Sequence, residues 1–200
     1  SLSLAWASFS WAAANPAAEL EAKLNQLTSL SASFDQLTQD GRGLKIQQSQ
    51  GQVQLAKPKL FYWHTQQPYE QLVVSNGQLM WVYEPDLEQV TQQPVDEQLN
   101  TSPAFLLIDQ ATNLAKHYQI TKQQQGGKST FTLVPLQQET LFEELKLIFN
   151  KEEIASLQLT DSLGQKTIIS LYLETLNQPL NPNKFNFIPP EGVDLIKQTP

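Results

Sequence analysis

Cysteine is absent from this chain of 200 residues. Its absence excludes disulfide bonds, thiolate metal sites, cysteine nucleophiles and lipid anchors attached through sulfur. The apolar core must therefore stabilise the fold without cross-links. Hydrophobic residues make up 40% of the sequence, which is sufficient for such a core, and the length is typical of one compact domain.

Positive charge is also scarce. Lys and Arg total 13 against 20 Asp and Glu, so the formal net charge is -7 at pH 7. Nucleic-acid surfaces need clustered cations, and this charge balance therefore argues against a nucleic-acid partner. The same acidity opposes permanent attachment to anionic lipid headgroups, so we expect only transient contact with membranes.

Catalytic signatures are missing as well. The sequence contains no GxSxG, HExxH, GxGxxG or P-loop pattern. His64 and His117 are far apart in the sequence, which favours a structural role for each. The adjacent acids at 96–97, 143–144 and 152–153 could suggest glycosidase carboxylates, but neighbouring residues of a strand point to opposite faces. We therefore predict neither an enzyme nor a metal or cofactor site.

The first 14 residues form an apolar, uncharged segment that ends in three alanines. This pattern is typical of the end of a secretory signal peptide with an A-x-A cleavage site. A transmembrane helix is the alternative, but it needs about 20 apolar residues, and Ser8 and Ser10 interrupt this run. We expect residues 1–14 to be a leader and residues 15–200 to form a single exported domain.

Two helical segments are predicted. Asn15 is a suitable N-cap, and Pro16 is favoured at the first helical position. Apolar residues then recur at helical spacing, which predicts an amphipathic helix that ends near residue 30. Its apolar positions are Leu20, Leu24, Leu27 and Leu30. A short apolar run at 104–108 predicts the second helical piece.

The remainder of the chain has the period of β-strands. Phe61 and Trp63 would share one face of a strand, with Tyr62 and His64 on the other. Asn-Gly at 76–77 predicts a hairpin with a type I′ turn. About ten strands are expected, the last of them at residues 185–188, and they would form one antiparallel sheet with both helical pieces on one face.

The sequence has many aromatic side chains compared with the short helical segments that could cover them. We expect one sheet face to carry Phe61, Trp63, Trp81, Tyr83, Phe131 and Phe149. One interpretation is that these residues are simply the core. The other is that the sheet and the helices enclose more apolar wall than side chains can fill, which would leave a ligand cavity. Sequence alone does not decide between the two.

A family resemblance starts at residues 57–63. Lys57-Pro58, followed by Phe61 and Trp63, matches the K/R-P-x-x-F-x-W stretch of the LolA family of periplasmic outer-membrane lipoprotein carriers. Further similar runs follow in order and extend the resemblance over residues 15–200. These runs are 67–70, 72–77, 79–85, 88–91 and 185–193.

The resemblance implies a mainly β fold. It would be an incomplete, half-open antiparallel β-barrel of about eleven strands with a lid of short α-helices over an apolar cavity. It also implies a monomeric chaperone that binds acylated lipoproteins released by an inner-membrane ABC transporter and passes them to an anchored outer-membrane receptor. That receptor carries a lipidated cysteine, so the absence of cysteine favours the carrier. A periplasmic lipid-binding sensor of the same fold remains the alternative.

The resemblance also suggests which residues act. We expect lid contacts from Leu20, Leu24, Leu27, Leu30, Phe105, Leu107 and Ile108, and cavity walls from Phe34, Phe61, Trp63, Trp81 and Tyr83. The family typically has an arginine at position 57, where it hydrogen-bonds carbonyls of the lid. Lys57 offers a point charge in place of a planar five-donor fork, so we expect a weaker latch. A solvated lysine at a hairpin end is the other interpretation.

Overall fold

The computed structural model describes residues 15–95, 103–137 and 142–198; the expected leader at 1–14 lies outside them. In these ranges the strands are β1 (Ser29–Gln39), β2 (Lys45–Ala56), β3 (Leu60–Gln67), β4 (Gln71–Asn76), β5 (Leu79–Glu84), β6 (Gln89–Pro94), β7 (Tyr118–Gln125), β8 (Lys128–Pro135), β9 (Glu144–Asn150), β10 (Glu153–Thr160), β11 (Lys166–Leu176) and β12 (Asp194–Lys197). The helical elements are α1 (Pro16–Gln26) and the 3-10 helices η1 (Pro85–Leu87), η2 (Pro103–Leu107), η3 (Leu114–Lys116) and η4 (Pro182–Phe185).

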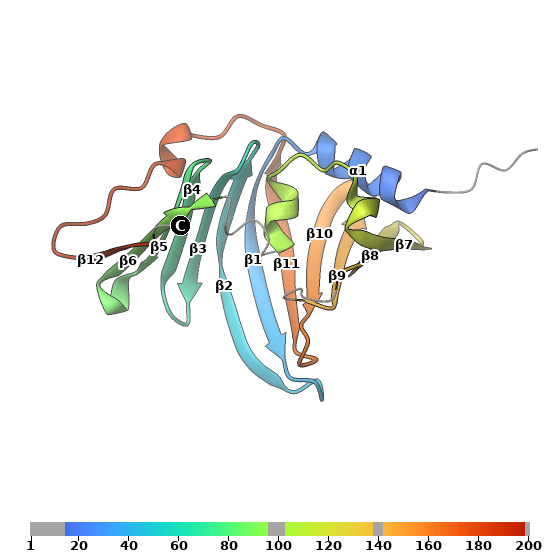
Figure 1. Cartoon of the computed structure of the whole chain (residues 1–200), viewed down its shortest axis with the longest axis horizontal. Helices are drawn as coiled ribbons and strands as arrows, with labels where there is room; N and C mark the ends of the chain where they lie inside the picture. The colour runs from blue at the N-terminus through green and yellow to red at the C-terminus, as the bar shows by residue number, and fades with distance from the viewer. Residues whose placement is uncertain (1–14, 96–102, 138–141, 199–200) are drawn as a thin grey trace, which may run out of the picture.

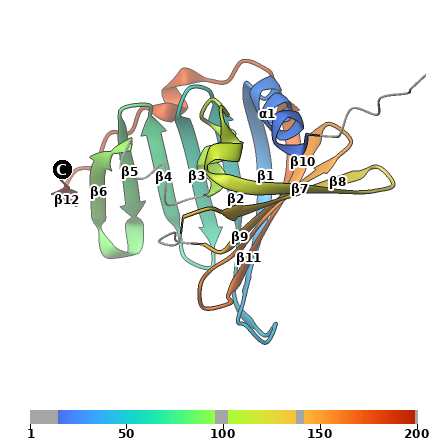
Figure 2. The same ribbon diagram turned by 45° about the vertical axis from the view of Figure 1, so that its right-hand side comes forward.

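All these strands belong to one sheet of order β12-β6-β5-β4-β3-β2-β1-β11-β10-β9-β8-β7 (Figure 1). The sheet curls strongly, and Figure 2 shows β7 to β9 crossing in front of the central strands. Its edges, β12 and β7, do not pair with each other, so the barrel stays open. The predicted half-open, mainly β architecture is confirmed, with twelve strands in place of about eleven.

The prediction of a closing strand at residues 185–188 is wrong. Phe185 ends η4, and the edge strand is β12, which pairs in parallel with β6. Pro189 and Pro190 follow the expected strand directly and have no N–H group to donate to a sheet ladder. Residues 177–193 instead cross the sheet as a covering segment, coloured orange-red in Figure 1.

Helix α1 begins as predicted but ends earlier. The Asn15 side chain accepts a hydrogen bond of 3.2 Å from the Ala18 amide and so caps the first turn. The helix stops at Gln26, and Leu27 is already extended. Leu30 therefore lies on β1 and not on the helix, because its neighbours pair with β2 and β11 in the sheet. In the described ranges no helix is long and apolar enough to cross a membrane.

The hairpin at 76–77 forms, but its turn differs from the prediction. Gly77 has a φ of +92°, whereas Asn76 ends β4 and does not adopt the left-handed conformation of a type I′ turn. The Asn76 side chain instead accepts hydrogen bonds from the amides of Gln78 and Leu79, at 3.0 and 2.9 Å. These bonds stabilise the link between β4 and β5.

The sheet has two apolar faces of unequal size. We call the face that packs against α1 and residues 103–116 the inner face; it carries the main core, including Phe34, Phe61 and Phe131. The opposite, outer face carries a second cluster around Val74, Trp81 and Val90, which the C-terminal segment covers. The interior between the inner face and its helical cover is where a ligand cavity would have to form.

Candidate functional site

Helix α1 and residues 103–116, together termed the lid, cover the inner face. Leu20 and Leu24 on the buried side of α1 are almost inaccessible to solvent, and Leu107 and Ile108 of the second piece belong to the same apolar core. Helical spacing places Leu20 and Leu24 one turn apart on one side of the helix. The lid therefore rests on the sheet through aliphatic contacts.

The turn between β2 and β3 holds both pieces of the lid. The Lys57 ammonium donates a hydrogen bond to the backbone carbonyl of Leu24 in α1. The Lys57 amide donates to the Thr28 carbonyl, and the Lys59 amide donates to the Ile108 carbonyl, each at 2.9 Å. The structure does not show the alternative of a solvated lysine, since Lys57 contacts the lid directly.

Burial lowers the pKa of Lys57 from its ordinary value, and the negative charge of Asp109 partly opposes this shift. Desolvation disfavours the charged form of a lysine, so the hydrogen bond to the Leu24 carbonyl offsets part of the cost of burial. In its ammonium form, Lys57 makes a charge-assisted hydrogen bond to the lid.

The two pieces of the lid are also bound to each other. The Asn25 side chain donates to the Ala111 carbonyl at 2.7 Å and accepts from the Ala111 amide at 2.9 Å. One turn earlier, Glu21 accepts from the Leu114 amide at 2.7 Å. These bonds satisfy backbone groups of the loop that no strand pairs with. We conclude that α1 and residues 109–114 form one connected unit.

Two ion pairs join α1 to the other half of the sheet. Lys23 contacts Glu152, in the turn between β9 and β10, at 2.6 Å. Glu19 contacts Lys122 of β7, also at 2.6 Å. Each lysine also lies over an aromatic ring, Lys23 over Phe149 and Lys122 over Phe131. Both ion pairs lie on one flank of the helix, because Glu19 and Lys23 are about one turn apart, while its underside is apolar.

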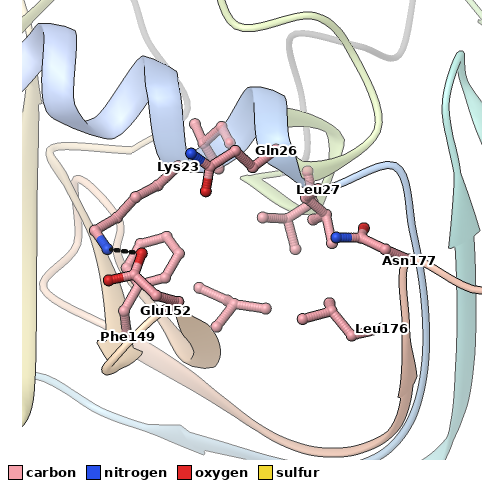
Figure 3. A pocket seen from close by; sticks show the side chains of 10 residues that line it. Lys23, Gln26, Leu27, Phe149, Glu152, Leu176 and Asn177 are labelled. Atoms are coloured by element: carbon pink, nitrogen blue, oxygen red, sulfur yellow. Dashed lines mark hydrogen bonds and ion pairs between the residues drawn. The ribbon is translucent and has the colours of Figure 1, made fainter.

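A cavity of about 100 Å³ lies between α1, η2 and strands β9 to β11 (Figure 3). It is lined by Lys23, Leu24, Gln26, Leu27, Leu107, Phe149, Glu152, Ile154, Leu176 and Asn177. Apolar side chains form its interior, and the polar ones lie on its rim. An apolar cavity of about 150 Å³ is enough for one benzene molecule. The cavity is thus too small for an acyl chain in this conformation.

The predicted lid contacts fall into three groups. Leu24, Leu27 and Leu107 line the cavity. Leu20, Leu30 and Ile108 are buried in the core around it, Leu30 from β1. Phe105 lies in η2, and its side chain is outside the described part of the structure.

The residues predicted to form the cavity wall are divided between the inner and outer faces of the sheet. Phe34, Phe61 and Trp63 form an aromatic group on the inner face, with ring centroids 4.2 Å apart for Phe34 and Trp63. The placement of Trp81 and Tyr83 on the same face is wrong, since they pack on Phe187 on the outer side of the sheet. The register pairs Trp81 with Val74, and Val74 with Tyr62, so all three share the outer face.

Met80 and Val82 take the inner positions expected for Trp81 and Tyr83. Both pack into the main core, with Met80 opposite Ser75 and Val82 opposite Val73. Period-two spacing identifies the two faces of one strand, but only the register across a hairpin shows which faces join. The sequence pattern therefore does not place β5 relative to β3.

This separation predicts different effects for the two faces. Phe187→Ala should lower the free energy of unfolding by about 1–3 kcal/mol, because it removes apolar contacts on the outer face. It should leave the uptake of an apolar fluorescent probe unchanged, because Phe187 contacts Trp81 and Tyr83 and not the cavity. Urea unfolding and probe titration measure the two quantities, and a matching loss of probe binding would contradict the assignment of faces.

Several cavity residues are not identified by the sequence pattern. It places Phe149 on the apolar face but not at a site, and it does not single out Ile154 or Leu176. In the sequence, Lys23 is typical of a solvent-exposed helix position and Glu152 of a solvent-exposed turn, so neither is predicted to line a cavity. Alternating side chains identify β9 and β10, but only the position of these strands beneath α1 makes their residues part of a cavity.

Reactive groups are not gathered at this site. In the part of the chain that the structure describes, no three His, Asp or Glu side chains are positioned to hold a metal ion. His64 lies 2.8 Å from Glu70, and Glu144 pairs with Lys146 at 3.0 Å. The acidic pair at 96–97 lies outside the described residues. The arrangement is suited to enclosing an apolar group.

Comparisons with known proteins agree with this geometry. The family model of the outer membrane lipoprotein carrier protein LolA matches residues 25–188. The outer-membrane lipoprotein carrier protein of Azotobacter vinelandii is 41% identical over 175 residues, which are 88% of this chain and 84% of that protein. The corresponding protein of Chromohalobacter salexigens is 40% identical over 182 residues, 91% of this chain and 87% of that protein.

A solved structure supports the fold alone. An uncharacterized conserved protein from Thermus thermophilus superposes with a TM-score of 0.58 at 11% identity, covering 92% of this chain and 100% of that one. The sequence matches are the stronger finding, because identities of 40–41% extend over 88–91% of this chain, against 11% identity for the structural match. The chain belongs to the LolA family of outer membrane lipoprotein carrier proteins.

Proposed function

We propose that this protein is a periplasmic chaperone that carries acylated lipoproteins. It would receive them from an inner-membrane ABC transporter, enclose their acyl chains beneath the lid and deliver them to an anchored outer-membrane receptor. Family membership supports the cargo class, and the apolar cavity beneath a hydrogen-bonded lid supports the mode of binding. The lid is the observation that supports this proposal most directly. Its hydrogen bonds and ion pairs to the sheet are separate from the pairing of the strands, so they can break while the sheet stays intact.

The small cavity makes opening an essential part of this function. Each buried methylene contributes about 0.8 kcal/mol, so enclosing ten of them contributes about 8 kcal/mol. The described cavity of about 100 Å³ cannot hold a chain of that length. We infer that the lid is closed in this structure. Cargo binding would lift α1 from the strands that carry Phe149 and Ile154, and closure on release would return it.

Release of lipoproteins from spheroplasts tests the proposal. Spheroplasts that synthesise labelled lipoproteins are incubated with the purified protein, and the medium is then fractionated by size. A carrier should bring newly made lipoprotein into the medium in a one-to-one complex. Retention of all labelled lipoprotein on the spheroplasts would contradict the carrier function and favour the lipid-binding sensor. A heat-denatured sample controls for leakage from damaged cells.

A further inference from the structure

The rim of the cavity contains a lysine whose surroundings are unusual. The Lys23 side chain is only 10% exposed, whereas that of its partner Glu152 is 76% exposed. Figure 3 shows the Lys23 ammonium at one end of the cavity, beside Glu152 and the ring of Phe149. A charged group near an apolar cavity loses hydration, and such a position is costly unless polar partners compensate. The exposed carboxylate of Glu152 is a partner that can move aside.

The hydrogen-bonding capacity of this ammonium is not fully used. It has three N–H donors. In the described residues it contacts Glu152 at 2.6 Å and the Lys151 carbonyl at 3.5 Å, the latter at the limit of a hydrogen bond. The turn that supplies both acceptors is fixed in place, because the Lys151 amide donates to the Gly127 carbonyl at 2.7 Å. One donor is left for a third acceptor, and Lys23 lines the cavity from which that acceptor would come.

An acyl chain that enters here once the lid has opened would bring such an acceptor. Its hydrocarbon would contact Leu24, Phe149 and Ile154, and its ester or amide carbonyl would have to remain at the rim, since burying a carbonyl without a donor is costly. We infer that Lys23 binds the carbonyl at the head of the acyl chain and so distinguishes acyl esters and amides from plain hydrocarbon. This inference rests on the proposed function and names the polar group that the site recognises.

Another lysine provides a matched comparison. Lys122 also pairs with a glutamate across the boundary between α1 and the sheet, and it also lies over a phenylalanine ring. It does not line the cavity. If Lys23 only ties the helix to the sheet, the two lysines should behave alike. If Lys23 binds the head of the acyl chain, only Lys23 should affect the choice of ligand.

Two ligands that differ in one carbonyl test the inference. 1-Monomyristoylglycerol has an ester carbonyl, and 1-O-tetradecylglycerol is the ether that lacks it. Each ligand is titrated into the whole chain, which carries an uncharged fluorescent reporter of ligand binding. The wild type should prefer the ester by about tenfold, as expected for a charge-assisted hydrogen bond. Lys23→Met should bind both ligands equally, and Lys122→Met should retain the preference.

Glu152→Gln separates recognition from helix attachment, because it removes the ion pair but leaves the Lys23 ammonium. This variant should retain the preference for the ester. Equal binding of ester and ether by the wild type, or an unchanged preference in Lys23→Met, would overturn the inference. Loss of the preference in Glu152→Gln or Lys122→Met would also overturn it. Failure of the wild type to bind either ligand would instead contradict the proposed function. Circular dichroism confirms that each variant is folded.

Discussion

Gly51→Ala is expected to destabilise the protein by about 4 kcal/mol or more, or to prevent folding. A Cβ atom at this position would lie 1.9 Å from the His64 carbonyl oxygen and 3.0 Å from the Phe34 ring. The first contact is with backbone of the paired strand β3, which cannot rotate away. Relief would require β3 to move from β2 at the register shift between Gln50 and Gly51.

A second glycine controls for the general effect of the substitution. Gly127→Ala would place its Cβ 3.7 Å from the nearest atom, which is ordinary contact. Its free energy of unfolding should change by less than about 1 kcal/mol. Urea unfolding followed by far-UV circular dichroism measures both variants. Equal midpoints for the two would show that β2 and β3 separate more easily than the register indicates.

Lys57→Met is expected to raise the equilibrium constant for lid opening about 10- to 100-fold relative to the wild type. The variant leaves the Leu24 carbonyl without the charged donor that it has now. A hydrogen bond to a charged group contributes about 1.5–3 kcal/mol, and 1.4 kcal/mol corresponds to a tenfold change in an equilibrium. Hydrogen exchange should become faster in both α1 and residues 109–114, because hydrogen bonds between Asn25 and Ala111 join them.

Lys57→Arg tests the direction of the same effect. The planar guanidinium offers five donors, so it should hold the Leu24 carbonyl more firmly and slow hydrogen exchange in the lid relative to the wild type. Amides of β10 and β11 serve as the internal reference, since both strands pair within the sheet and not with the lid. Exchange in the lid that is the same for lysine, methionine and arginine would contradict a latch at this position.

Much of the fold follows from local patterns. Asn15 and Pro16 predict the start of α1 correctly, because capping depends on only a few neighbouring residues. Phe61 and Trp63 share a face as period two requires. The end of α1 does not follow from local patterns, because it depends on partners distant in sequence. The Thr28 amide donates to the Asn177 side chain at 2.8 Å, a contact that no local window contains.

The site is less predictable than the fold. Helical spacing identifies Leu24 and Leu27, and both line the cavity. Only the family resemblance singles out Lys57, since a lysine before a proline has no distinctive periodicity. The importance of Lys23 depends on the β9–β10 turn, more than a hundred residues away in the sequence. Such pairings arise from the curl of the whole sheet, which side-chain patterns do not encode directly.

The sheet order has a consequence for how the chain folds. Strands β1 to β6 are neighbours in sequence order, and so are β7 to β11, so each half can assemble from successive hairpins. Pairing of β1 with β11 joins the halves and brings together residues 29–39 and 166–176. Contacts between such distant segments incur a large loop-closure entropy and form slowly. We therefore expect the pairing of β1 with β11 to be the slowest step in assembling the sheet, and until it forms each half would expose an unpaired strand to aggregation.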